Sequence, residues 1–171
     1  MLALAGVLAP CVALADEAAD LRRLMRQGDL PAALQRAEAA VAAQPQNAEL
    51  RFLQGLILID QQSDAAALVV FTRLAQEFPE LPEPQNNLAY LHARAGRWEA
   101  ARVALEAALR YSPNQRLMRE NLGDVHLQLA LQAWAEAGVP EATVQRKLRL
   151  RRDLSMPAAA LVDSGATAPS R

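Results

Sequence analysis

The stretch that decides the fold is Asn87–His92, which reads Asn-Leu-Ala-Tyr-Leu-His. Moved forward by 34 residues, it falls on Asn121–His126, which reads Asn-Leu-Gly-Asp-Val-His, so the asparagine, leucine and histidine coincide. Moved back by the same step, Ala89 falls on Gly55. The prolines that follow each unit keep the same period: Pro45, Pro79 and Pro113. This period predicts a repeat in which each unit is a pair of antiparallel helices.

The composition favours an all-α fold. Apolar residues make up 52% of the chain but aromatic residues only 4%. Alanine and leucine supply most of the apolar content, and both favour helices. The formal net charge of -1 gives no indication of nucleic-acid binding. The sequence has neither a glycine-rich phosphate loop nor a nucleophile-elbow motif, so it predicts a chain that is not an enzyme.

The unit 82–115 resembles a tetratricopeptide repeat. Leu88 and Ala89 stand where that family has Leu-Gly. Gly96 matches the turn glycine, and Trp98 takes the aromatic place after the turn. Further units are at about 16–47, 48–81 and, in degenerate form, 116–154. The resemblance implies a right-handed superhelix of antiparallel helix pairs, in which the first helices line a concave groove and a C-terminal helix caps the open end.

Small residues and turn glycines recur in the expected places. Gly28 and Gly96 are expected to take the left-handed turn conformation, whereas Gln62 and Ser63 replace the glycine of the second unit. Small side chains are expected where two helices approach closely: Gly55, Ala67, Ala89, Ala101 and Gly123. The resemblance implies that His92 and His126 take the place of a tyrosine buried between two helices. We therefore expect no metal site and no cofactor.

The two ends of the chain differ from the repeats. Residues 1–15 are uncharged and apolar but shorter than the roughly 20 residues of a membrane span. They predict a secretory signal peptide cut after Ala15, and hence a periplasmic protein. A buried N-terminal helix and a membrane anchor formed by an uncleaved N-terminus are the alternatives. Residues 155–171 are rich in Ala, Ser, Gly, Pro and Thr, which predicts a disordered tail.

The last predicted helix, 141–154, is strongly basic. Its cations are Arg146, Lys147, Arg149, Arg151 and Arg152. One interpretation is a solvated outer face on a capping helix, and the other is a weak docking patch for an anion. The sequence does not decide between these two interpretations.

The groove implied by the resemblance is the candidate binding site. The positions assigned to it are Phe52, Leu56, Asn86, Asn87, Tyr90, Arg94, Glu120, Asn121 and Asp124. Asn87 and Asn121 occupy the same repeat position, and their amides could grip the backbone of an extended peptide or link neighbouring turns of the solenoid. Phe52 and Leu56 could line the groove or be covered as core by the N-terminal helix. The lysine place of the family's carboxylate clamp holds Phe52, Asn86 and Glu120, so that clamp is not expected.

These features predict a non-catalytic scaffold or adaptor of the bacterial cell envelope that binds a protein or peptide in its groove. We expect no nucleic acid and no small-molecule substrate. The alternatives are an accessory subunit of an envelope enzyme or assembly complex, and a structural module that associates with itself.

Overall fold

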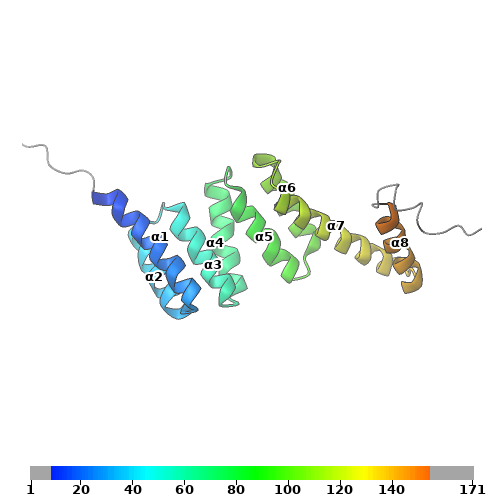
Figure 1. The fold of residues 1–171 in the computed structure, drawn as a ribbon, viewed down its shortest axis with the longest axis horizontal. Helices are drawn as coiled ribbons and strands as arrows, with labels where there is room; N and C mark the ends of the chain where they lie inside the picture. Colours follow the sequence, from blue (N-terminus) through cyan, green and yellow to red (C-terminus); the bar gives the residue numbers. More distant parts are fainter. Residues whose placement is uncertain (1–8, 155–171) are drawn as a thin grey trace, which may run out of the picture. The chain divides into compact units, whose positions relative to one another are not determined.

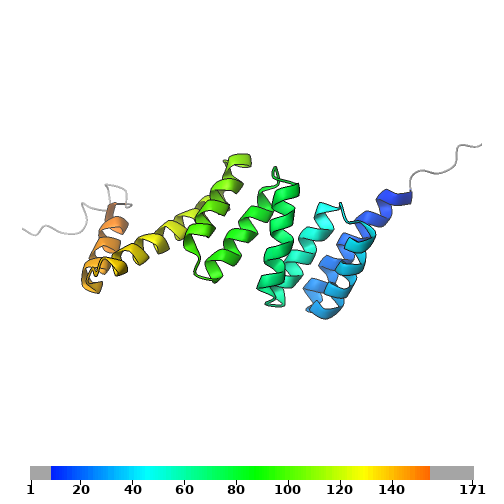
Figure 2. The ribbon, with the colours of Figure 1, turned by 180° about the vertical axis from the view of Figure 1, so that it is seen from behind.

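The structure, a computed structural model, describes residues 9–154 and is helical throughout that part of the chain (Figures 1 and 2). It contains no strand there, so the predicted all-α class is confirmed. The helices are α1 (Ala9–Gln27), α2 (Leu30–Ala43), α3 (Ala48–Asp60), α4 (Asp64–Glu77), α5 (Pro82–Arg94), α6 (Trp98–Tyr111), α7 (Arg116–Glu136) and α8 (Glu141–Leu154). The chain divides into two compact units between Val125 and His126, within α7.

The first unit contains three helix hairpins in succession. α1 packs on α2, α3 on α4 and α5 on α6, and the hairpins join because α2 packs on α3 and α4 packs on α5. α1 also contacts α3, so the first helices of neighbouring hairpins meet. A single hairpin leaves one apolar face open, and stacking of this kind buries it.

The turns inside the hairpins share one geometry. Gly28 and Gly96 have φ of 77° and 70°, as predicted, and Gln62 takes the same left-handed conformation with φ of 60°. In each turn an amide N–H donates to the carbonyl five residues earlier, which closes the helix end. These bonds are Asp29 N to Leu24 O (3.2 Å), Ser63 N to Leu58 O (2.8 Å) and Arg97 N to His92 O (2.9 Å).

Small residues let the helices of the hairpins α3–α4 and α5–α6 approach closely. A Cβ built on Gly55 would lie 2.5 Å from Cζ of Phe71 on α4, so only glycine fits there without movement of the ring. Ala67 and Ala101 are fully buried and Ala89 almost so, as predicted. The prediction for Gly123 is wrong, because a Cβ there meets nothing within 4 Å and the residue is exposed. No second helix of the first unit covers that side of α7.

The second unit consists of the end of α7 and α8. α7 ends at Glu136, Gly138 follows in the left-handed conformation with φ of 65°, and α8 starts after Pro140. The bounds of α8 agree with those of the predicted last helix, 141–154. Val144 of α8 is buried within this unit. The role of α8 as an end cap stays a prediction.

The predicted terminal segments lie mostly outside the described residues. The described residues do not include 1–8 of the predicted signal peptide or the predicted tail at 155–171. α1 begins at Ala9, ahead of the predicted cut after Ala15, and its buried residues Ala18 and Leu21 follow that cut. Among the described helices, none is long and apolar enough to cross a membrane.

Candidate functional site

A row of polar and aromatic side chains lies on the first helix α5, with Asn86 half-buried and Tyr90 and Arg94 exposed. Asn86, Tyr90 and Arg94 are four residues apart, so they share one face of the helix. Tyr90 is 49% exposed, although tyrosine is a large and partly apolar side chain. An exposed aromatic ring beside amide and guanidinium groups is the combination that is enriched at protein interfaces.

Arg94 is held in place by two contacts. Its guanidinium carbon lies 5.6 Å from the centre of the Tyr90 ring, within the range of a cation–π interaction. Its Nη1 lies 3.2 Å from Oδ1 of Asp64, at the start of α4. The ion pair fixes the arginine over the ring and links α5 to the preceding hairpin. Asp64 is absent from the predicted site because it belongs to a second helix, which the repeat pattern does not assign to the groove.

The predicted amide pair, Asn87 and Asn121, forms neither two equivalent free amides nor two equivalent links between turns. Asn121 Nδ2 donates to Asn86 Oδ1 at 3.0 Å, and this bond links α7 to α5. Asn87 Nδ2 donates to the backbone carbonyl of Glu83 at 2.9 Å, within its own helix. The two residues that share a repeat position thus make different bonds, and the side-chain link forms between Asn86 and Asn121.

The apolar positions of the predicted groove are partly used for packing. Phe52 meets Phe71 of α4 edge to face, with the ring centres 5.6 Å apart. Leu56 packs against the core cluster that α1, α2 and α3 form, which includes Leu21 and Ala33. Both side chains are half-buried. Of the two interpretations left open by the sequence, packing in the core that includes the N-terminal helix holds for Leu56, whereas Phe52 packs on α4 instead. Each side chain keeps an exposed part.

The acidic positions lie on α7 and are exposed. Glu120 Oε1 is 3.4 Å from Nε of Arg116, one turn earlier on the same helix. Asp124 is exposed as well. Because both carboxylates face water, they contribute charge to this part of the surface and little to stability.

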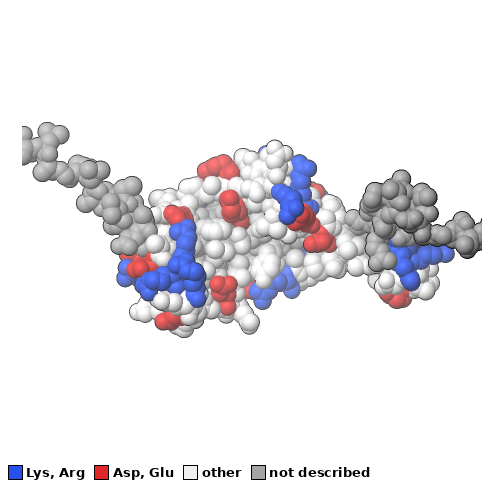
Figure 3. All heavy atoms as spheres, viewed as in Figure 1, with Lys and Arg blue, Asp and Glu red and all other residues white. Residues whose placement is uncertain are grey.

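At the other end of the first unit the surface is basic. Arg side chains gather over α1 in the space-filling view (Figure 3). Arg22 Nη2 lies 2.5 Å from Oε1 of Glu49 on α3, which links the first helices of two hairpins. Arg26 is exposed. The face formed by first helices therefore carries guanidinium groups on α1 and carboxylates on α7.

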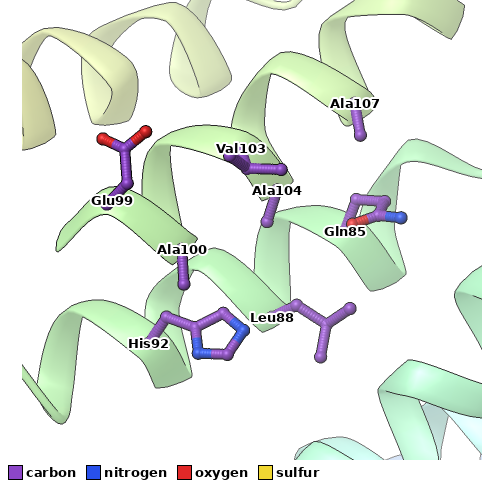
Figure 4. Close-up of a pocket in the computed structure, with 8 residues that line it drawn as sticks. All are labelled: Gln85, Leu88, His92, Glu99, Ala100, Val103, Ala104 and Ala107. Carbon is purple, nitrogen blue, oxygen red and sulfur yellow. The ribbon is translucent and has the colours of Figure 1, made fainter. Parts of the chain in front are cut away.

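The two histidines have different surroundings. His92 lies in an open groove of about 490 Å³ between α5 and α6 (Figure 4). The lining is mostly apolar: Gln85, Leu88, His92, Glu99, Ala100, Val103, Ala104 and Ala107. His92 Nδ1 accepts a bond from Nε of Arg97 at 3.1 Å. Partial burial, and then the positive charge of Arg97, lower the pKa of His92.

His126 does not have the expected place between helices, because it is exposed. The helix that should cover it is missing from the first unit, as at Gly123. Within the described part of the chain, no group of three or more His, Cys, Asp or Glu side chains is arranged to hold a metal ion.

Stacked helix hairpins with an exposed polar and aromatic face define a helical-repeat protein. Two family models, both described as tetratricopeptide repeat, match residues 15–82 and 58–124. The chain belongs to the tetratricopeptide-repeat family, and residues 15–124 carry the match, as the resemblance implied. Repeats of this kind build protein–protein interaction modules. No sequence among curated proteins matches the chain.

Solved structures with low sequence identity share the fold. The first tetratricopeptide-repeat domain of human RPAP3 has a TM-score of 0.64 at 15% identity, over 68% of this chain and 92% of that one. The first such domain of Spaghetti (RPAP3), bound to an HSP90 peptide, has a TM-score of 0.65 at 15% identity, over 73% and 99%. The Yersinia enterocolitica type III secretion chaperone SycD, in complex with a peptide of the translocator YopD, has a TM-score of 0.62 at 13% identity, over 75% and 98%.

Proposed function

We propose that this chain is a non-catalytic scaffold or adaptor that binds a protein segment on the face formed by its first helices. The observation that carries the proposal is the α5 row, in which Tyr90 is half exposed and Arg94 is fixed over its ring. Tyrosine and arginine supply a large share of the binding energy in protein interfaces, most of all when they are held rigid before binding.

The surroundings of the row suit an extended segment. The Asn86–Asn121 pair leaves amide groups that can donate to and accept from a peptide backbone. The half-exposed edges of Phe52 and Leu56 offer apolar contact on α3. Two of the structural neighbours hold peptides, one from HSP90 and one from YopD, which supports a peptide as the kind of partner.

We place the protein in the bacterial cell envelope, most specifically the periplasm. The support is the uncharged run at 1–15, which ends in small residues just before Asp16. N-terminal sequencing of the protein from its native host should give Asp16 as the first residue of the mature chain. Recovery of an intact Met1 chain from the cytosol would overturn this location.

Site-specific photocrosslinking tests the binding face. A photoreactive phenylalanine analogue is placed at Tyr90 in one variant and at Val69 in another. Val69 is a matched control because it is 52% exposed, close to the 49% of Tyr90, but lies on the second helix α4. Irradiation in the native host should give an adduct with a different protein from position 90 and not from position 69.

The other outcomes separate the alternatives. An adduct of twice the chain's own mass from position 90 would indicate the self-associating module. Equal adducts from both positions, or none from either, would contradict a binding site on the first-helix face. Mass spectrometry of the adduct identifies the partner and distinguishes a scaffold from an accessory subunit of an enzyme.

A further inference from the structure

The helix α8 concentrates positive charge. Its sequence, EATVQRKLRLRRDL, contains five basic residues between positions 146 and 152 and two acidic residues, Glu141 and Asp153. Lys and Arg atoms are visible on this part of the molecule in Figure 3. Lys147 is also the only lysine in the chain.

The cations of the first unit and those of α8 differ in the ion pairs that they form with carboxylates. Most arginines of the first unit form ion pairs with carboxylates: Arg22, Arg23, Arg36, Arg51, Arg94, Arg102 and Arg116. The α8 cations whose side chains the structure describes are Arg146, Lys147 and Arg149, and all of them are exposed. Among the described residues, none of these forms an ion pair. We call them the α8 basic face.

Two apolar side chains of α8 are wholly or partly covered. Val144 is buried and Leu148 half-buried within the second unit, and Nζ of Lys147 lies 5.4 Å from the ring centre of Trp134 on α7. These contacts fix which side of α8 faces water. The basic face is therefore presented by an anchored helix, whereas a helix that enters a membrane surface needs a free apolar face.

We propose that the α8 basic face binds an acidic segment of a partner protein, rich in Asp or Glu. Exposed guanidinium and ammonium groups attract carboxylates, and guanidinium groups also bind them through two parallel hydrogen bonds. A nucleic acid is the poorer fit, because Trp134, the aromatic side chain next to the face, is half-buried and covered by Lys147, so it offers no ring for bases to stack on. The α8 basic face shares no residue with the first-helix face, so the proposal of one can fail without that of the other.

A peptide titration at low ionic strength tests the proposal. The full chain is mixed with a fluorescent peptide of eight glutamates, and binding is followed by anisotropy. The variant R146Q/K147Q/R149Q should weaken binding roughly tenfold, since an exposed ion pair contributes a small factor and three are lost. The matched control R73Q/R97Q/R110Q removes three exposed arginines of the first unit that lie outside the first-helix face, and it changes the net charge equally. It should leave the affinity within about twofold of wild type, because none of the three arginines belongs to the α8 basic face.

Carbodiimide coupling locates the contact directly. The reagent joins an amine to a touching carboxylate, and Lys147 is the only lysine side chain available. The peptide should couple to Lys147, and 0.5 M salt should abolish the coupling. Equal weakening by both triple variants, or coupling at the N-terminal amine alone, would overturn the proposal. Tighter binding of the full chain to phosphatidylglycerol vesicles or to a single-stranded oligonucleotide than to the peptide would overturn the choice of an acidic protein.

Discussion

The hairpin α3–α4 and the helix α7 follow the same 34-residue pattern, but only the hairpin forms a complete repeat. On α3, Gly55 lies under the ring of Phe71, whereas the equivalent Gly123 on α7 faces open space. α3 ends after 13 residues and the chain turns back, while α7 continues for 21 residues. A repeat position becomes a packing position only where a second helix returns to cover it.

The cause of the difference can be found at the turn position. The residues at this position are Gly28, Gln62 and Gly96, and the next place in the series is Ala130. Gln62 still turns because Ser63 and Asp64 follow it, and such residues favour helix starts. Ala130 is followed by Leu131 and Gln132, which favour helix, so α7 continues.

The largest expected effect comes from enlarging a buried alanine. Ala101 is fully buried between helices, and its equivalent one repeat later, Ala135, is exposed. Ala101→Leu should reduce the free energy of unfolding by about 1–3 kcal/mol through overpacking. Ala135→Leu should change it by less than about 0.5 kcal/mol. Thermal unfolding followed by circular dichroism measures both, and equal melting temperatures for the two variants would show that the repeats are equivalent after all.

The same substitution, glycine to alanine, should change the free energy of unfolding in opposite directions at the equivalent positions 55 and 123. Gly55→Ala puts a methyl group against Phe71 and should cost about 1–2 kcal/mol, after the gain in helix propensity is subtracted. Gly123→Ala meets no neighbour, so only that gain remains, about 0.5–1 kcal/mol of stabilisation. Denaturant unfolding of both variants checks the signs. A loss of stability in Gly123→Ala would mean that a helix does cover this position.

The turn between α3 and α4 offers a smaller test. Gln62 has a positive φ, which costs a residue with a side chain about 1 kcal/mol. Gln62→Gly should therefore stabilise the chain by up to about 1 kcal/mol, and Gly96→Gln should destabilise it by a similar amount. The melting temperatures of the two variants should shift in opposite directions. A shift in the same direction would indicate that the Gln62 side chain makes a compensating contact.

The smallest effect concerns an ion pair that links α3 to α4. Arg51 is buried and forms two hydrogen bonds with the carboxylate of Glu77. The hydrogen bond from Arg51 lowers the pKa of Glu77, and desolvation offsets only part of the effect. A lowered pKa in the folded state contributes stability above the pKa of the unfolded chain, and this stability is lost as pH falls through the lower, folded value.

The melting temperature of Glu77→Gln should accordingly depend less on pH below about 4.5 than that of wild type. Arg149→Gln on α8 is the matched control, because Arg149 has no ion pair among the described residues, and its pH dependence should equal that of wild type. An unchanged acid profile in Glu77→Gln would show that the pair contributes nothing to the linkage between the two helices.

Local chemistry in the sequence was enough to predict the helices, the turns and the family. Glycines at Gly28 and Gly96 take left-handed turns, and the prolines follow the second helices, because these preferences belong to single residues and act within one or two turns of chain. The basic helix α8 could be predicted on the same grounds.

Only the tertiary structure decided which members of the repeat make contacts. The 34-residue period predicts three pairs of equivalent residues, but the members of each pair differ in burial or in hydrogen bonding. The pairs are Gly55 and Gly123, His92 and His126, and Asn87 and Asn121. Asp64, which holds Arg94, has no signal in the repeat pattern at all. Burial and side-chain pairing depend on whether another helix lies opposite the residue. The position of a residue within the 34-residue period does not reveal this, because it is decided only when the helices stack.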